Sequence, residues 1–236
     1  YKIYLDDGRE LLLYEDVILK FELLLKKEIL EKDIMDIELF NQECDVYHVA
    51  LESINHRFKS IYDTKEFLIK KEYPIDMIDI CIDKLVNQGY LNDRSFAKSY
   101  INNQIITTNK GPYKIRRELG EHRVDGNIID EELIVFDEEK QLEKIDKVAN
   151  RLYKANRNRG GSVLKQKIVS DLVNLGYDVS TISKVISNYD FGNNDDIAKK
   201  EYDKLYKKLS RKYDGKELEY KIKEKLYQKG LYYEEN

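Results

Sequence analysis

The chain has 236 residues, of which 36% are charged and 42% are hydrophobic, and its formal net charge is −4. It contains only 2 Pro and 11 Gly, below the usual frequencies of about 5% and 7%. All-β folds need many turn residues, so this composition favours a mostly helical, soluble protein. The apolar runs are too short for a membrane helix, no signal peptide is apparent, and Cys44 and Cys81 are too few for a disulfide framework. These features predict a cytoplasmic protein.

Residues 1–46 differ in kind from the rest of the chain. They hold 6 Lys or Arg and 13 Asp or Glu, a net charge of −7. The stretches "YKIYL" and "RELLLY" flank "DDG", which predicts a small β-hairpin with Gly8 in its turn. Two short helices are expected next, in "EDVILKFELLL" and "EKDIMDIELFNQE", followed by a long helix from about Cys44. A hairpin alone is marginally stable, so we expect it to pack on these helices.

A repeat of 51 to 54 residues occupies the remainder. Its marker is a leucine that precedes a helix end, at Leu68, Leu119, Leu172 and Leu226. An inward position four residues earlier carries Thr64, Ile115, Ile168 and Ile222. The helix-ending position four residues later carries Glu72, Arg123, Gly176 and Gly230, and an apolar or aromatic residue follows each. This pattern predicts one helix face closed by a residue in the left-handed conformation, which glycine adopts most easily.

The repeat predicts tandem three-helix units, similar to helix-turn-helix modules, in a curved array. We expect an N-terminal segment at 1–46, three units at 47–92, 93–136 and 137–190, and a partial unit of two helices at 195–236. In the first unit the helices are expected at about 47–59, 60–72 and 75–88, with Ser60 and Asp63 as a capping box. Leu119 and Leu172 are expected in the core.

Four segments of the sequence resemble the RecX family, whose members regulate the RecA recombinase. The segments are "ALESINHRFKSIYDTKEFLIKKEY" (50–73), "LVNQGYLNDRSFAKSYI" (85–101), "KGPYKIRREL" (110–119) and "KIKEKLYQKGL" (221–231). They are similar to the family's A-L-x-x-x-x-x-R-x-x-S opening, its G-Y-L-N-D-x-x-F-A junction, its K-G-x-x-x-I-x-x-E-L second unit and its later K-G helix ends. The chain departs from the family pattern at Glu72 and Arg123, which replace glycine at two helix ends.

The resemblance implies a monomeric, non-enzymatic regulator that binds the helical groove of the RecA–DNA filament. Such a regulator would mainly inhibit the ATPase and strand exchange of RecA, and so act in homologous recombination, the SOS response and DNA repair. Extended surfaces made by stacked repeats suit a helical partner of this kind. No cofactor is implied.

The residues themselves do not indicate an enzyme. Phosphate-binding loops of the G-x-x-x-x-G-K-[ST] and G-x-G-x-x-G kinds are absent from the sequence, and no nucleophile with a nearby base is recognisable. Cys44, His48, Glu52 and His56 are spaced by four on one helix, but that face turns by about 40° at each step, so they cannot all reach one metal ion. We therefore expect neither catalytic nor metal-binding residues.

Two alternative functions are a non-sequence-specific DNA-binding protein and a helical adaptor or scaffold. A helix-turn-helix reader of DNA bases would need basic third helices. Here the third helix of the first unit carries Asp76, Asp79 and Asp83, and that of the second carries Asp125 and Asp130. Repulsion from phosphates argues against base recognition, although contact with DNA phosphates remains open.

Basic residues gather on other helices, which makes them the candidate contacts with RecA or DNA phosphate. Residues 144–168 hold eight Lys or Arg and one Asp. Arginine can bind carboxylate or phosphate through two parallel hydrogen bonds. The competing interpretation is that local acids such as Glu118 and Glu121 pair with these side chains. The candidate contact residues are Lys114, Arg116, Arg117, Arg151, Lys154, Arg157, Arg159 and Lys165.

Overall fold

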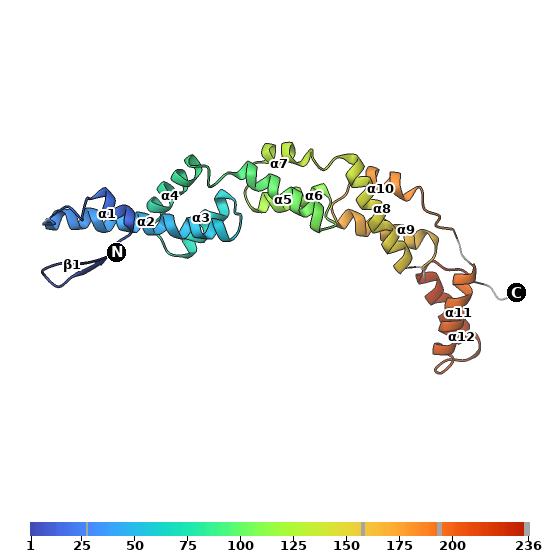
Figure 1. Cartoon of the computed structure of the whole chain (residues 1–236). Helices are drawn as coiled ribbons and strands as arrows, with labels where there is room; N and C mark the ends of the chain where they lie inside the picture. Colours follow the sequence, from blue (N-terminus) through green and yellow to red (C-terminus); the bar gives the residue numbers. More distant parts are fainter. Residues whose placement is uncertain (27, 157–158, 193–194, 234–236) are drawn as a thin grey trace. The chain divides into compact units, whose positions relative to one another are not determined.

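The computed structural model describes residues 1–26, 28–156, 159–192 and 195–233. These residues form twelve helices and one two-stranded sheet (Figure 1). The chain divides into two compact units, one made of residues 1–99 and 119–129 and the other of residues 100–118 and 130–236. Within the described residues, both strands lie in the first 14 positions and helices fill most of the chain from residue 44 onward. The predicted all-α fold with a small N-terminal hairpin is confirmed.

The N-terminal hairpin packs on helices, as expected. Strands β1 (Lys2–Tyr4) and β2 (Glu10–Leu12) pair antiparallel, and Gly8 in the turn has a φ of 90°. Helix α1 (Glu15–Lys20) follows directly. One side of the hairpin supplies Leu11 to a core that includes residues of α1 and of the helix that follows it. Burial of that apolar side is what stabilises so short a sheet.

Helix α2 (Glu31–His56) runs without a break for 26 residues. The prediction of a separate short helix before Cys44 was therefore wrong, and the expected boundary between residues 46 and 47 falls inside α2. No Pro or Gly occurs between residues 31 and 56 that would end the helix. The carboxylate of Asp45 on α2 accepts hydrogen bonds from the hydroxyls of Tyr14 (2.6 Å) and Tyr73 (2.5 Å). One helix thus belongs both to the hairpin cluster and to the first three-helix unit.

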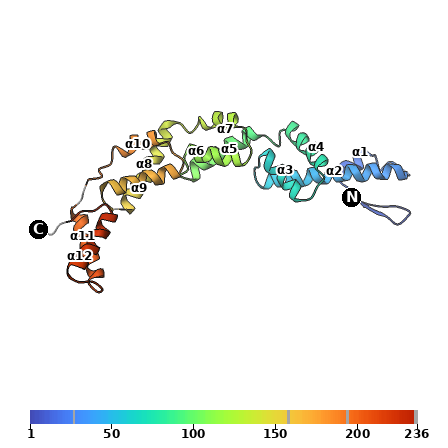
Figure 2. The ribbon, with the colours of Figure 1, turned by 180° about the vertical axis from the view of Figure 1, so that it is seen from behind.

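Helices α3 (Ile61–Lys70) and α4 (Ile75–Asn87) pack on α2 and on each other, as both ribbon views show (Figure 2). The hydroxyl oxygen of Ser60 accepts a hydrogen bond from the backbone N–H of Asp63 at 3.0 Å, which begins α3 as the capping pattern predicts. Leu68, Ile78 and Leu85 are fully buried between the three helices.

The four repeated helix ends share one geometry. The predicted left-handed position has a positive φ in every repeat: 65° at Glu72, 58° at Arg123, 91° at Gly176 and 69° at Gly230. In each, the N–H one residue later bonds to the carbonyl of the marker leucine, at distances of 2.9 to 3.4 Å. This is the Schellman arrangement, which satisfies carbonyls left free at a helix end. All four leucines are at most 1% exposed, which confirms the expected burial of Leu119 and Leu172.

The remaining helices follow in chain order. They are α5 (Asp93–Thr107), α6 (Pro112–Glu121), α7 (Gly126–Leu133), α8 (Glu138–Ala155), α9 (Gly161–Asn174), α10 (Val179–Ile186), α11 (Asp195–Leu209) and α12 (Gly215–Gln228). In the second compact unit, α8 packs on α9 and α10, and α11 packs on α12. The predicted division into units at 93–136, 137–190 and 195–236 stays a prediction.

In the second compact unit, main-chain hydrogen bonds join the start of one helix to the end of a later helix. At the start of α6, the N–H of Gly111 bonds to the carbonyl of Leu175 at 2.7 Å, and the N–H of Tyr113 bonds to that of Gly176 at 3.1 Å. At the start of α9, the N–H of Gly160 bonds in the same way to the carbonyl of Lys229 at 2.8 Å. Free N–H groups at a helix start are therefore satisfied by free carbonyls at the end of another helix.

The first compact unit makes the equivalent contact with side chains. Ser60 and Arg123 occupy the positions that glycines hold elsewhere. Nδ1 of His122 lies 2.8 Å from a carboxylate oxygen of Asp63, and the guanidinium of Arg123 lies 5.8 Å from the centre of the Tyr62 ring. Polar and cation–π contacts thus take the place of a close backbone approach.

Candidate contact surface

The segment 110–119 owes its pattern to internal packing rather than to an exposed binding site. Ile115 and Leu119 are fully buried, and Gly111 lies against the backbone of Gly176. Glu118 accepts hydrogen bonds from Nζ of Lys110 (2.7 Å) and from the hydroxyl of Tyr100 (2.9 Å). Burial raises the pKa of Glu118, but these hydrogen bonds outweigh it and hold the pKa below its ordinary value. Glu118 was expected as a possible partner of the neighbouring arginines, and its described partners are Lys110 and Tyr100.

Arg116 is exposed on α6 and is bound to a neighbouring helix. Its Nε and one terminal nitrogen donate to the two carboxylate oxygens of Asp130 on α7, at 2.7 and 3.1 Å. The hydrogen bonds raise the pKa of Arg116 and lower that of Asp130. An outside carboxylate or phosphate would have to compete with this two-bond pair. Arg117 is likewise exposed on α6, whereas Lys114 is half-buried.

The basic side chains of residues 144–168 differ in whether they have internal partners. Nζ of Lys144 donates to the carbonyl of Thr108 at 2.7 Å, and Nζ of Lys167 bonds to Asp171 at 2.9 Å, so both are used internally. Among the described residues, no hydrogen bond or ion pair engages the side chains of four predicted contacts, which we name the third-unit basic set: Arg151, Lys154, Arg159 and Lys165. Arg157 was also predicted as a contact and lies outside the described residues.

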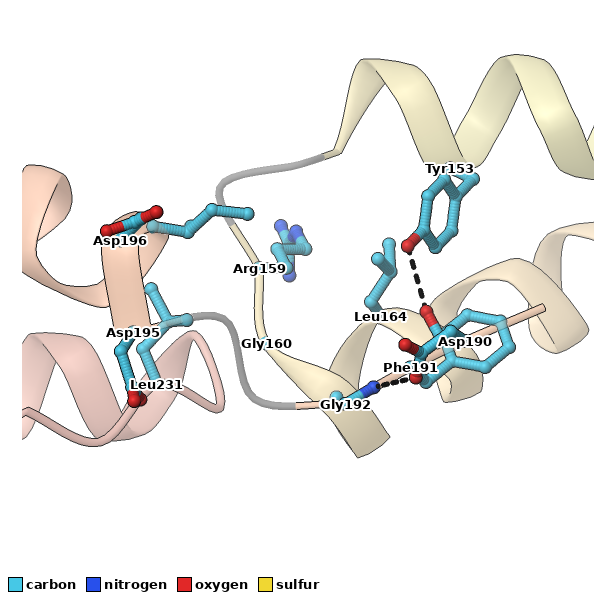
Figure 3. A pocket seen from close by; sticks show the side chains of 12 residues that line it. Tyr153, Arg159, Gly160, Leu164, Asp190, Phe191, Gly192, Asp195, Asp196 and Leu231 are labelled. Carbon is cyan, nitrogen blue, oxygen red and sulfur yellow. Dashed lines mark hydrogen bonds between the residues drawn. The ribbon is translucent and has the colours of Figure 1, made fainter.

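Arg159 differs from the rest of the basic set because it is half-buried. It projects into a cavity of about 370 Å³ between α8, α9 and α11, opposite Asp195 and Asp196 (Figure 3). Tyr153 closes another side, and its hydroxyl donates to the carbonyl of Asp190 at 2.8 Å. Arg151, Lys154 and Lys165 are exposed on their helices. The exposed members are therefore better placed than Arg159 to reach a large partner.

The described residues assemble no recognisable catalytic or metal-binding group. No cluster of three or more His, Cys, Asp or Glu side chains suited to a metal ion occurs among them. Burial raises the pKa of the Cys81 thiol to about 11, which disfavours the reactive thiolate at neutral pH. In the part of the chain that the structure describes, no helix has the length and apolar character to span a membrane.

In the described residues, twelve helices with one type of helix end repeated four times define a helical-repeat protein. The family model for the second three-helix domain of RecX matches residues 92–133. Regulatory protein RecX of Streptococcus sanguinis strain SK36 is 30% identical over 98% of this chain and 90% of its own length. Regulatory protein RecX of Listeria welshimeri is 31% identical over 99% of this chain and 88% of its own length. The chain belongs to the RecX family of regulatory proteins.

Solved structures agree with this assignment. A crystal structure of a regulatory protein RecX matches with a TM-score of 0.70 at 28% identity, covering 80% of this chain and 93% of its own. The crystal structure of RecX from Lactobacillus salivarius matches with a TM-score of 0.59 at 25% identity, covering 62% of this chain and 95% of its own.

Proposed function

We propose that the protein binds the RecA–DNA filament in the cytoplasm as a monomer and lowers the rates of ATP hydrolysis and strand exchange by RecA. Membership of the RecX family supports a regulatory role, and the family resemblance supplies RecA as the partner. The proposed contact site rests on one observation in the described part of the chain, the unpaired basic side chains of the third-unit basic set. Among the described residues no acid pairs with its cations, whereas Lys144, Lys167 and Arg116 all have internal partners.

In this proposal the exposed basic side chains bind acidic RecA residues or DNA phosphates. Arg151 and Lys154 are three residues apart on α8 and therefore lie on the same face of the helix. Such contacts position a protein on a polyanion without reading its sequence. Asp130 holds Arg116, so Arg116 is the weaker anchor of the predicted set.

The test is the double charge reversal R151E/K154E in the full chain. We expect weaker binding to RecA assembled on single-stranded DNA, a smaller inhibition of RecA ATPase, and an unchanged melting temperature. The affinity of the variant should fall with added salt no more steeply than that of the parent chain, because phosphate contacts have been removed.

The matched control is K70E/K98E, which changes the net charge equally at two exposed lysines of the first compact unit. It should bind and inhibit like the parent chain. If R151E/K154E does so too, the contact site is wrong. If the parent chain at saturation leaves the RecA ATPase rate unchanged, the proposed function itself is wrong.

A further inference from the structure

Helix α12 carries alternating lysines and tyrosines along one face. Positions 216, 220, 223 and 227 follow the helical repeat and therefore lie within one narrow stripe. All four side chains are exposed, with Tyr220 at 66% and Tyr227 at 67%. We call Lys216, Tyr220, Lys223 and Tyr227 the Lys–Tyr stripe. Its apolar rings are not part of the α11–α12 core, which is formed by the opposite face of α12.

A shallow groove runs beside the stripe. The segment after α12 brings Tyr232 alongside, with its ring centre 6.0 Å from that of Tyr227 and the two planes at 81°. The groove has a volume of about 590 Å³, and the buried side chains of Leu226 and Leu231 contribute to its lining. Aromatic rings therefore line it and remain exposed to solvent.

The charge of this region is positive. Residues 199–229 hold 12 Lys or Arg and 6 Asp or Glu, a net charge of +6. The one carboxylate that lines the groove, Glu224, bonds to Nζ of Lys221 at 3.2 Å. Lys216 and Lys223 form no ion pair with any residue that the structure describes. The groove therefore suits a ligand that is both anionic and able to stack on aromatic rings.

We infer that the Lys–Tyr stripe of α12 binds single-stranded nucleic acid, with bases stacked on Tyr220 and Tyr227 and phosphates held by Lys216 and Lys223. Tyr220 and Tyr227 are seven residues apart, or about 10 Å along the helix. That length corresponds to roughly three stacked nucleotides at about 3.4 Å each. Bases of a duplex are already stacked on one another, so a site of this kind prefers single strands and tolerates any sequence. The inference does not depend on RecA.

A tryptophan reporter tests stacking directly, because the chain contains no Trp. The variant Y227W places a single indole in the stripe, and Y4W places one at an equally exposed tyrosine of the acidic hairpin. On titration with an oligothymidylate of about 15 nucleotides, the emission of Y227W should be quenched and that of Y4W should not. Quenching of both, or of neither, would overturn the inference.

Alanine variants test whether stacking contributes to affinity. By fluorescence anisotropy with the same labelled oligonucleotide, Y220A/Y227A should bind at least about tenfold more weakly than the parent, because each stacked base is worth about fivefold or more. Y220F/Y227F should retain most of the affinity, and the control Y4A should retain all of it. Equal binding by the parent and Y220A/Y227A would refute the site, as would equal parental affinity for a duplex of the same length. RecA is absent from these assays, so their failure leaves the proposed function untouched.

Discussion

Gly111 and Gly176 approach so closely that a β-carbon on Gly111 would lie 2.4 Å from the carbonyl oxygen of Gly176. Gly176 is equally crowded by α6, since a β-carbon on Gly176 would lie 2.5 Å from the backbone nitrogen of Lys114. Gly160 and Gly230 repeat the contact, because a β-carbon on Gly160 would lie 2.1 Å from the carbonyl oxygen of Gly230. Glycine at these positions therefore permits a backbone approach that any side chain would block.

The first prediction follows from this contact. G111A should lower the free energy of unfolding by about 1 to 3 kcal/mol, because the added methyl must push the two backbones apart. Chemical denaturation would measure the loss. G120A, near the end of the helix that Gly111 precedes, is the matched control, since nothing lies within 4 Å of its added β-carbon. It should be neutral or stabilise α6 by about 0.5 to 1 kcal/mol, and an equal loss in both variants would contradict the steric explanation.

The second prediction concerns Glu72, an exposed residue with a φ of 65°. A non-glycine residue in this conformation costs about 1 to 2 kcal/mol, and glycine recovers part of it after its greater entropy loss on folding. E72G should therefore raise the free energy of unfolding by roughly 0.5 to 1 kcal/mol. E66G, inside α3, should lower it by about 1 kcal/mol. Destabilisation by E72G would mean that the side chain contributes more than its conformation costs.

The third prediction concerns pH. The pKa of Glu118 lies below its ordinary value of 4.5 in the folded chain, so its stabilising effect is fully present above that value and is lost as the pH falls below it. E118Q should lower the free energy of unfolding at pH 7 by roughly 1 to 3 kcal/mol, because Lys110 loses its charged partner. Below about pH 4 the difference between E118Q and the parent should shrink. Urea midpoints at several pH values would show this, and a difference independent of pH would exclude the ionised carboxylate as its source.

The fourth prediction concerns the marker leucines. L119A and L172A should each lower the free energy of unfolding by about 2 to 5 kcal/mol, since both side chains are fully buried. V173A, at an exposed position of α9, should cost less than about 1 kcal/mol. A loss below about 1 kcal/mol in either leucine variant would show that its site collapses without a cavity.

Local pattern was enough to predict the helix ends. The spacing of the marker leucines placed Glu72 and Arg123 in register with two glycines, and all four residues have a positive φ. The same kind of reasoning missed the continuity of α2, because the change from acidic to mixed composition was interpreted as a boundary. The lack of Pro and Gly between residues 31 and 56 was the signal that favoured one helix.

Partners distant in sequence could not be predicted. Basic residues of α8 and α9 looked alike in the sequence, yet Lys144 turns inward to Thr108, 36 residues earlier, while Lys154 remains exposed. Arg116 was expected to face solvent or a nearby glutamate, and it pairs with Asp130, 14 residues later. The ion pair of Lys110 with Glu118 was also missed, although its eight-residue spacing recurs in the K-G-x-x-x-I-x-x-E-L pattern. Such pairings depend on how helices pack, and a charge pattern alone does not specify that packing.

The main-chain bonds from Gly111 and Gly160 to the ends of α9 and α12 have an evolutionary consequence. Interfaces made by side chains must coevolve, because a change on one surface requires a matching change on the other. A joint made of N–H and carbonyl groups, as at Gly111 and Gly160, does not depend on matched side chains and requires only that a small residue stand at each end. Gene duplication or deletion of a whole unit can therefore lengthen or shorten such a protein without the invention of a new interface.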